Sequence, residues 1–445
     1  MGNLHGIRGP ARWGITAAAA RTSLLLSLLF LVVYGSCNWI TTQRTDVGTW
    51  YFAWERHIPF VPLMIIPYMS IDLFFVAAPF LCRDAQELRT FTRRISLAIV
   101  VAGICFLILP LRFAFERPMT TGWLGTLFNA FRSLDQPYNL FPSLHIALRT
   151  LLADLYARHS RGLGYILLQV WFSLIGLSTV FTYQHHIVDV LGGFVLAVGC
   201  RYCLPATPMR FPVVRNPRVG AYYGLGTVLM LGLTVVTWPW GGLLLWPAGA
   251  LSIVTAAYHG VGPGIFRKSA GQLPLSTWLL LGPVLMGQHL SLWYYRRQCR
   301  PWDEVVPGVL IGRTLSNAEA SEAIRRGVTA VLDLTAEFSE ALPFLCTTYR
   351  HLPILDLTAP TMEQLHDAVR FITAQAASGT VYVHCKIGYS RSAAAVGAYL
   401  LASGQATTVA NVVERLRQAR PSIIVRPEVW EALHTFARTS RLDPS

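Results

Sequence analysis

Charged side chains are scarce in this sequence. They make up 13% of its 445 residues, whereas hydrophobic residues make up 53%; soluble domains carry about 25% charged residues. Acidic residues are the scarcest, because residues 1–300 contain 9 Asp and Glu against 24 Lys and Arg, while residues 301–445 contain 14 against 13. This shortage excludes a wholly soluble protein. Basic loops between apolar runs indicate a membrane protein whose loops meet anionic lipid head groups.

A basic patch on a soluble face is also missing, so we expect the membrane as a partner and no nucleic acid. The eight cysteines are scattered and lie mostly in apolar runs, so no disulfide framework is predicted. Cys200 and Cys203 form a CxxC pair, but the pair lies in an apolar run without a second pair. A metal or redox role for it is therefore not favoured.

The apolar runs are long enough for membrane helices, which need roughly 20 residues. Nine candidates are Thr22–Ile40, Val61–Cys82, Ile95–Leu111, Phe141–Tyr156, Leu163–Thr182, His186–Leu204, Ala221–Trp240, Gly241–Ala257 and Leu275–Tyr295. Basic residues before the first run could mark a signal peptide. The further runs and the lack of a clear cleavage site favour an uncleaved first helix.

The positive-inside rule predicts a cytoplasmic N-terminus. Basic clusters then lie on the cytoplasmic side after two, four, six and eight apolar runs. The segments 112–141 and 183–186 are placed on the outer side. The basic residues used for this orientation are Arg8, Arg12, Arg21, Arg83, Arg89, Arg93, Arg94, Arg158, Arg161, Arg210, Arg215, Arg218, Arg267 and Lys268. The ninth run is ambiguous, because Arg296, Arg297 and Arg300 follow it and Pro283 lies within it. We expect an interfacial or re-entrant ninth run and a cytoplasmic C-terminal domain, with a true crossing as the alternative.

The pattern changes near Pro301, where short strand-like and helix-like runs alternate. Strands are predicted at 308–313, 328–334, 349–355 and 380–384, and helices at 316–326, 362–377, 392–401, 407–418 and 427–438. Such alternation is typical of an α/β domain with a largely parallel sheet. We predict four regions: an N-terminal segment with the first membrane helix (1–50), a membrane domain (51–205), additional membrane helices (206–300) and an α/β domain (301–445). The N-terminal membrane part is expected to be all-α, with about nine apolar segments and a six-helix core.

A compact motif follows the last predicted strand. In the segment from Val381 to Ser392, VYVHCKIGYSRS, a cysteine and an arginine are separated by five residues between a strand and a helix. Such a loop can form a ring of backbone N–H groups that binds a dianionic phosphate and stabilises a thiolate. We predict Cys385 as the nucleophile and Arg391 as a bidentate phosphate clamp. Further phosphate-loop candidates are Lys386, Gly388 and Ser392.

Expelling an alkoxide requires an acid. Asp356 precedes a predicted helix and lies 29 residues before Cys385, which makes it the candidate general acid. The alternatives are a buried structural thiol for Cys385, a capping or loop role for Asp356 and a solvated Lys386. Asp333, inside a strand-like run, is predicted to be structural.

The segment 302–440 resembles the dual-specificity branch of the protein tyrosine phosphatases through its His-Cys-x5-Arg-Ser signature. The resemblance implies a phosphocysteine on Cys385, phosphate binding by Arg391 and acid/base catalysis by Asp356. The sequences His-Cys-Lys at 384–386 and Asp-Leu-Thr-Ala-Pro-Thr at 356–361 are most similar to lipid-directed mitochondrial phosphatidylglycerophosphate phosphatases.

A second polar constellation lies within the apolar region. Its pieces are RFAFERP at 112–118, FPSLH at 141–145 and HHIVD at 185–189. His185 and Asp189 share one face of a helix, so the carboxylate can orient the imidazole. His185 is then a candidate nucleophile and His145 a candidate acid. Candidate phosphate-binding residues are Arg117, Arg112 and Ser143.

This pattern resembles the type 2 phosphatidic acid phosphatase superfamily over residues 50–205, in particular the branch with sphingolipid head-group transferases. Two features differ from the usual motifs: only four residues separate Arg112 from Arg117, and Ser178-Thr179 stands where Ser-Arg is usual. One phosphate-binding cation is therefore missing, which leaves transferase activity or a silent site open. The order of the two domains is similar to bacterial inner-membrane fusions of these families, including the enterobacterial Ynb group.

We therefore predict a bifunctional, multi-pass membrane phosphatase, in a bacterial inner membrane, that acts on lipid phosphates. No metal or cofactor is implied, because neither constellation has a carboxylate cluster or a His/Cys ligand set. Three alternatives stay open: a membrane-anchored phosphatase of phosphotyrosine, phosphoserine or phosphothreonine proteins; a head-group transferase with an attached phosphatase; and a transporter or scaffold whose membrane half is silent.

Overall fold

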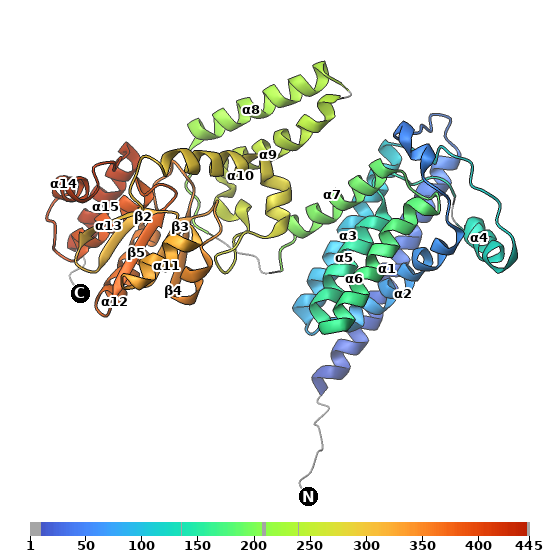
Figure 1. Ribbon diagram of the computed structural model, residues 1–445, viewed down its shortest axis with the longest axis horizontal. Coiled ribbons are helices and arrows are strands. Elements are labelled where there is room, and N and C mark those ends of the chain that lie inside the picture. The colour runs from blue at the N-terminus through green and yellow to red at the C-terminus, as the bar shows by residue number, and fades with distance from the viewer. Residues whose placement is uncertain (1–9, 135, 207–210, 239, 443–445) are drawn as a thin grey trace, which may run out of the picture. The chain divides into compact units, whose positions relative to one another are not determined.

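A computed structural model describes residues 10–134, 136–206, 211–238 and 240–442 (Figure 1). Arg8 and Arg210, two of the residues used above to predict orientation, lie outside this described part. The chain divides into two compact units, Met1–Pro208 and Met209–Ser445. Each unit is described by itself.

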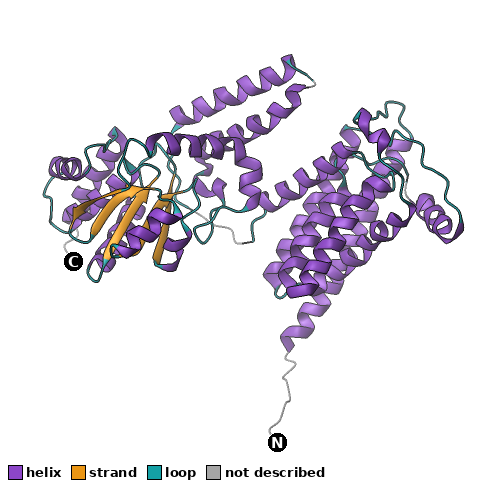
Figure 2. Cartoon of the chain, in the orientation of Figure 1, coloured by secondary structure: helices purple, strands orange, loops and turns teal. Residues whose placement is uncertain are grey.

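The first unit is helical (Figure 2). Its helices are α1 (Pro10–Thr42), α2 (Ile65–Leu81), α3 (Ala85–Ile108), α4 (Gly122–Leu134), α5 (Leu144–His159), α6 (Gly162–Phe181) and α7 (Ile187–Cys203). Buried side chains of α1, α2, α3, α5, α6 and α7 form one hydrophobic core, which confirms the predicted six-helix core. Gly193 in α7 is needed for close packing, because a Cβ there would lie 2.4 Å from the carbonyl oxygen of Ser143.

Six helices of the described residues are long and apolar enough to cross a membrane. They lie at Thr16–Thr42, Pro62–Leu81, Ala85–Ile108, Gly162–Phe181, Pro217–Val236 and Trp240–Val261. The other three predicted runs form α5, α7 and the later helix α10. α5 and α7 have only 16 and 17 residues, and both contribute buried residues to the bundle, so neighbouring helices cover them.

Sequence reasoning missed α4, which lies within the segment 112–141. This helix has one apolar edge: Phe128 is fully buried against Ile65 and Tyr68 near the start of α2. The apolar residues of this face alternate with polar ones, and the helix has only 13 residues. It therefore contains no long apolar run from which a helix could be predicted.

The second unit begins with a helical segment and ends in an α/β domain (Figure 1). The segment contains α8 (Pro217–Val236), α9 (Leu245–Ala256) and α10 (Leu275–Tyr295). Its core includes residues of α9 and α10 together with Ala336 and Leu355 of the α/β domain. The helical segment and the α/β domain therefore share a hydrophobic core.

The α/β domain confirms the predicted fold class. Its five strands are ordered β1-β2-β5-β3-β4, with β1 antiparallel to β2 and the other pairs parallel. They are β1 (Trp302–Val306), β2 (Val309–Arg313), β3 (Val328–Thr335), β4 (Thr348–Ile354) and β5 (Thr380–Cys385). The antiparallel edge strand β1 was not predicted, because it follows Pro301 without an alternating pattern.

Alternation along β5 sends its side chains to opposite faces of the sheet. Val381, Val383 and Cys385 share a core with the helices α12 (Met362–Ala376), α13 (Arg391–Ala402), α14 (Val409–Ala419) and α15 (Pro427–Leu442). Tyr382 packs instead with residues of α11 (Asn317–Arg325). The central strand thus ends with Cys385 on the face that α13 covers.

Candidate active sites

The phosphate-loop motif connects β5 to α13, so Cys385 is the last residue of a strand and Arg391 the first of a helix. Gly388 has φ 81°. A Cβ at this position would lie 2.5 Å from the carbonyl oxygen of Gly312, so the loop passes too close to β2 for any other residue. The backbone N–H groups at the start of α13 are thereby directed toward the Cys385 sulfur.

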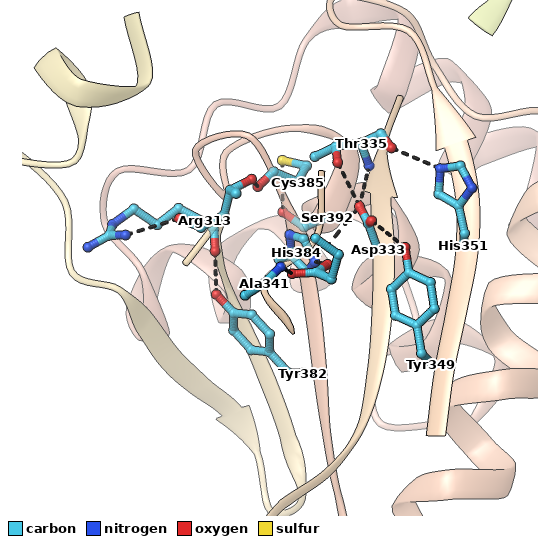
Figure 3. Close-up of polar contacts among 12 residues, drawn as sticks. Arg313, Asp333, Thr335, Ala341, Tyr349, His351, Tyr382, His384, Cys385 and Ser392 are labelled. Atoms are coloured by element: carbon cyan, nitrogen blue, oxygen red, sulfur yellow. Dashed lines mark hydrogen bonds and ion pairs between the residues drawn. The ribbon is translucent and has the colours of Figure 1, made fainter. Parts of the chain in front are cut away.

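The surroundings of Cys385 favour its thiolate. The side chain is 4% exposed, and its Sγ lies 3.4 Å from Oγ of Ser392 (Figure 3). Burial opposes ionisation, but the Arg391 guanidinium, the Ser392 hydroxyl and the N–H groups of Ser392 and Gly388 outweigh it. Together they hold the pKa of Cys385 below its usual value.

Arg391 is held in a fixed orientation by carboxylates and a carbonyl. Its Nη1 and Nη2 donate to the two oxygens of buried Glu337 at 3.1 and 2.7 Å, and Nη1 also donates to the carbonyl oxygen of Ile354 at 2.8 Å. Glu337 was not predicted from the sequence. It lies far from the motif along the chain and follows no recognisable spacing.

Asp356 lies beside the same guanidinium. Its Oδ1 is 3.3 Å from Nη2 of Arg391, and its side chain is 31% exposed while that of Arg391 is 2% exposed. The structure therefore brings together Cys385, Arg391 and Asp356, as expected from their types and spacing. The Asp356 carboxyl group is therefore partly accessible to solvent, whereas the guanidinium beside it is buried.

Behind the phosphate loop lies a buried network around His384 (Figure 3). His384 Nε2 is 2.7 Å from Oε2 of Glu340, and Tyr349 donates its hydroxyl to Asp333 at 2.7 Å. Burial opposes protonation of His384, yet the carboxylates of Glu340 and Asp333 raise its pKa above the usual value. The imidazolium is thereby stabilised next to Cys385 in the chain.

Asp333, Glu340 and His384 each offer a ligand atom, and these atoms lie within 4.8 Å of one another. Lys268, which follows α9, forms a buried ion pair with Asp333 and also donates to the carbonyl oxygen of Thr335 at 3.2 Å. The ammonium group of Lys268 is therefore already present as a cationic partner within this cluster. A metal centre does not fit such an arrangement.

Two further contacts of the loop were missed by sequence reasoning. Lys386, 8% exposed, donates from Nζ to Oε1 of Gln288 in α10 at 2.7 Å. Arg420, also buried, donates to the carbonyl oxygen of Ile387 at 3.0 Å and forms an ion pair with Asp303 at 2.7 Å. Both partners come from segments far away in sequence, where nothing local marks them.

The first unit brings the predicted histidines to one cavity. His145 and His185 both line a cavity of about 340 Å³, whose other lining residues include Phe30, Tyr34, Tyr68 and Phe75. His185 Nδ1 lies 3.7 Å from Oδ2 of buried Asp189. Among the described residues, Nδ1 of His185 and Nε2 of His145 have no hydrogen-bond partner.

The predicted phosphate-binding residues of this site are not among those that line the cavity. Ser143 caps α5 and accepts from the N–H of Ile146 at 3.2 Å. Arg117 donates from Nε to the carbonyl oxygen of Tyr183 at 3.0 Å, close in sequence to His185. The Arg112 side chain is exposed.

His186, the residue after His185, makes structural contacts. Its Nδ1 is 2.8 Å from Oε2 of buried Glu55, and its Nε2 accepts from the N–H of Ala114 at 3.1 Å. Glu55, which the sequence did not mark, also accepts from the N–H of Ile187 at 3.2 Å. This buried pair fixes the start of α7, where Asp189 lies.

Comparison with known proteins gives one family match in the α/β domain and one in the first, helical unit. Residues 313–439 match the family model described as dual specificity phosphatase, catalytic domain, and residues 46–203 match the PAP2 superfamily. The two matched regions contain the Cys385 site and the histidine pair, respectively.

Individual relatives match the C-terminal part. The chain is 31% identical over 167 residues to phosphatidylglycerophosphate phosphatase PTPMT2 of Arabidopsis thaliana, covering 36% of this chain and 72% of the relative. It is also 31% identical over 157 residues to phosphatidylglycerophosphatase and protein-tyrosine phosphatase 1 of Mus musculus, covering 32% of this chain and 76% of the relative. The crystal structure of PTPMT1 is 26% identical, with a TM-score of 0.29 and coverage of 32% of this chain and 96% of that one.

The chain is therefore a phosphatase that belongs to the dual-specificity phosphatase family, and it joins a domain of that family, related to the phosphatidylglycerophosphate phosphatases, to a PAP2 superfamily membrane domain.

Proposed function

We propose that this protein hydrolyses phosphate monoesters of membrane lipids at two separate sites. At the first, the Cys385 thiolate attacks phosphorus and forms a cysteinyl phosphate, while Asp356 gives a proton to the departing oxygen. Water then attacks the phosphocysteine, Asp356 takes a proton from it, and inorganic phosphate leaves. Each cycle therefore restores the thiolate and the acid.

The other residues of this loop bind the phosphoryl group. Arg391, oriented by Glu337, presents its fork to two phosphate oxygens. Gly388 permits the turn, Ser392 stabilises the thiolate when it is the leaving group, and Lys386 adds positive charge. The observation that carries the proposal is the lowered pKa of Cys385 beside a clamped arginine and a partly exposed aspartate.

A lipid substrate is supported by two observations. The relatives in plant and mouse are named as phosphatidylglycerophosphate phosphatases, and the candidate site shares its unit with helices that are apolar enough to cross a membrane. We infer a phosphatidylglycerophosphate-like or phosphatidic acid-like substrate. The mouse relative's name also includes protein-tyrosine phosphatase, which makes a phosphoprotein the second candidate.

For the membrane site we propose His185 as the nucleophile, oriented by Asp189, and His145 as the acid. The mostly apolar cavity that both histidines line suits the chains of a lipid substrate, and Arg117, Arg112 and Ser143 are the proposed phosphate contacts. Thr179 stands where the family usually has arginine and bonds to the carbonyl oxygen of Gly176. The missing cation supports head-group transfer as the alternative reaction here.

We propose a multi-pass location in a bacterial cytoplasmic membrane, with the four regions 1–50, 51–205, 206–300 and 301–445 predicted above.

The test of function uses the full-length protein in lipid nanodiscs with a panel of lipid phosphates and phosphopeptides. In a His185→Ala background, Cys385→Ser should abolish aryl phosphate hydrolysis, because a serine hydroxyl is not ionised at neutral pH. His185→Ala and His145→Ala should each remove a lipid activity that survives in Cys385→Ser.

The panel separates the alternatives. If Cys385→Ser kept most of the aryl phosphate rate in the His185→Ala background, the cysteine route would be wrong. If Cys385→Ser alone removed all lipid turnover, the membrane site would be silent. Turnover of phosphopeptides without turnover of lipids would favour the anchored protein phosphatase.

A further inference from the structure

The acid loop, residues 355–361, connects β4 to α12 and carries Asp356. Within this loop, Thr358 donates from its N–H and from its hydroxyl to the carbonyl oxygen of Leu355, at 3.3 and 2.8 Å. Leu357, the residue after the acid, has φ 60°, a left-handed conformation that is unfavourable for a residue with a side chain. Such a conformation persists where the surrounding structure holds it. The contacts that fix the backbone on either side of Leu357 are therefore of interest.

Those contacts come from the helical segment that precedes the α/β domain. Tyr258, just after α9, donates its hydroxyl to the carbonyl oxygen of Asp356 at 2.8 Å. Asn216, just before α8, donates from Nδ2 to the carbonyl oxygen of Leu357 at 2.8 Å. The two donors are joined to each other, because the N–H of Asn216 donates to the carbonyl oxygen of Tyr258 at 3.1 Å. The carbonyl groups on both sides of Leu357 are thus held by the same end of the helical segment.

The two donors belong to a membrane hairpin. Figure 1 shows α8 and α9 as a hairpin that points away from the sheet, and both helices are long and apolar enough to cross a membrane. The ring of Tyr223 in α8 stacks on that of Tyr258, with 5.6 Å between the ring centroids. Trp238 and Trp240 are exposed where the two helices connect, as tryptophans are at membrane interfaces. The acid loop is therefore bonded to the opposite, open end of the hairpin.

The Tyr258 bond bears directly on the acid. The carbonyl group of Asp356 and the N–H of Leu357 belong to one peptide group, and that N–H donates to Oδ1 of the Asp356 carboxyl at 3.1 Å. The same Oδ1 lies 3.3 Å from Nη2 of Arg391. The Tyr258 hydroxyl therefore holds one side of the peptide group whose other side binds the carboxyl. A general acid must lie within hydrogen-bond reach of the leaving oxygen, and a displacement of about 1 Å can cost about 10²-fold in rate.

We propose that Tyr258 and Asn216 are positioning residues of the cysteine phosphatase, through which the membrane hairpin fixes the orientation of the Asp356 carboxyl at the leaving oxygen. Tyr258 fixes the peptide group that binds the carboxyl, and Asn216 stabilises the left-handed conformation of Leu357. This inference rests on the proposed role of Asp356 as the general acid. It adds that the acid is oriented by helices outside residues 313–439, the part that matches the phosphatase family.

The experiment compares two substrates, an alkyl phosphate and nitrophenyl phosphate, with the full-length protein in nanodiscs. Every variant also carries His185→Ala, so that phosphate release reports the Cys385 site. The measured quantity is kcat/KM, which reports the steps up to the cysteinyl phosphate. Tyr258→Phe keeps the stacked ring and removes the hydroxyl donor, whereas Asn216→Ser keeps an oxygen that can cap α8 and removes the amide donor.

Each variant should lower kcat/KM for the alkyl phosphate by at least about tenfold, because the acid is displaced from the leaving oxygen. It should change kcat/KM for nitrophenyl phosphate by less than about threefold, because nitrophenolate leaves without a proton. The matched control is Tyr222→Phe, the same change at a position of α8 that is 75% exposed, which should keep both values.

A double variant separates positioning from a general loss of folding. In an Asp356→Asn background the acid is already absent, so that Tyr258→Phe should lower the alkyl phosphate value by less than about twofold further. An unchanged alkyl phosphate value would overturn the role of the residue that was replaced. Equal losses on both substrates, or a full further loss in the Asp356→Asn background, would overturn the positioning role alone. If Asp356→Asn itself reduced both substrates equally, the general acid role would be wrong, and the positioning role with it.

Discussion

At the scale of single residues, the Cys385 site depends on one carboxyl group for proton transfer. Asp356→Asn should lower turnover of an alkyl phosphate by about 10²–10⁴-fold, the range for loss of a general acid. The loss should be smaller for nitrophenyl phosphate, whose leaving group needs no proton. Steady-state rates with both substrates test this, and equal losses would indicate a binding or folding role.

The pKa of Cys385 should depend on the hydroxyl group of Ser392. Ser392→Ala removes the group 3.4 Å from Sγ that helps to lower the pKa of Cys385. Hydrogen bonds to charged groups contribute about 1.5 kcal/mol, so the pH midpoint of alkylation by iodoacetamide should rise by about one unit.

Mass spectrometry of the peptide containing Cys385 separates its alkylation from that of the exposed Cys203 and Cys346. Ser403→Ala, at an exposed position after α13, is the control and should keep the wild-type profile. A midpoint that moved down in Ser392→Ala would contradict the stabilising role of this hydroxyl.

The site residues that could be predicted from the sequence are those that lie close together along the chain. Cys385, Gly388 and Arg391 lie within one turn between a strand and a helix, so their spacing alone predicts a shared phosphate site. Glu337 and Gln288 could not be found in this way. Each reaches the site from another element, and a lone acid or amide carries no spacing that distinguishes it from a solvated side chain.

At the scale of elements, the loop after α9 is tied to strand β3 by the buried pair of Lys268 and Asp333. Lys268→Met should lower the free energy of unfolding by about 3–5 kcal/mol, because it leaves a buried carboxylate without its partner. Chemical denaturation of the full-length protein in detergent measures this loss.

The double variant Lys268→Met, Asp333→Asn should lose less than the sum of the single variants, since both charges are removed. Arg325→Met, which breaks an exposed pair with Glu322, is the control and should cost less than about 1 kcal/mol. A Lys268→Met protein as stable as the wild type would contradict the role of the pair.

Elements with a strong period were predicted well, and those without one were missed. α12 and α14 have periodic apolar positions and a threonine cap, whereas α4 is short and β1 is an edge strand. α5 and α7 begin later than the predicted runs because Phe141, Pro142 and His186 belong to the turns that precede the helices. Apolar composition alone does not separate a helix from the turn that leads into it.

At the scale of the whole molecule, the side of the membrane that holds the C-terminal domain can be tested. We expect the cytoplasmic side, since Arg296, Arg297 and Arg300 follow α10 and would otherwise lie outside. A fluorescent protein fused at Ser445 should therefore be bright in a bacterial host, because it folds only in the cytoplasm.

An alkaline phosphatase fusion at the same residue should be inactive, while one inserted in the segment 112–141 should be active and serves as the control. Strong alkaline phosphatase activity at Ser445 would show that α10 crosses after all.

The shared core of α9, α10, Ala336 and Leu355 has a practical consequence for preparing the enzyme. In a fragment that begins at residue 301, the apolar surface around Ala336 and Leu355 would be exposed to water. The buried Asp333 would also lack its partner, the ammonium group of Lys268. A workable fragment has to begin before α8, and it then brings two membrane helices with it. We therefore expect the Cys385 domain to need detergent or lipid, and a water-soluble preparation of residues 302–445 to be less stable than the same domain in the full-length protein.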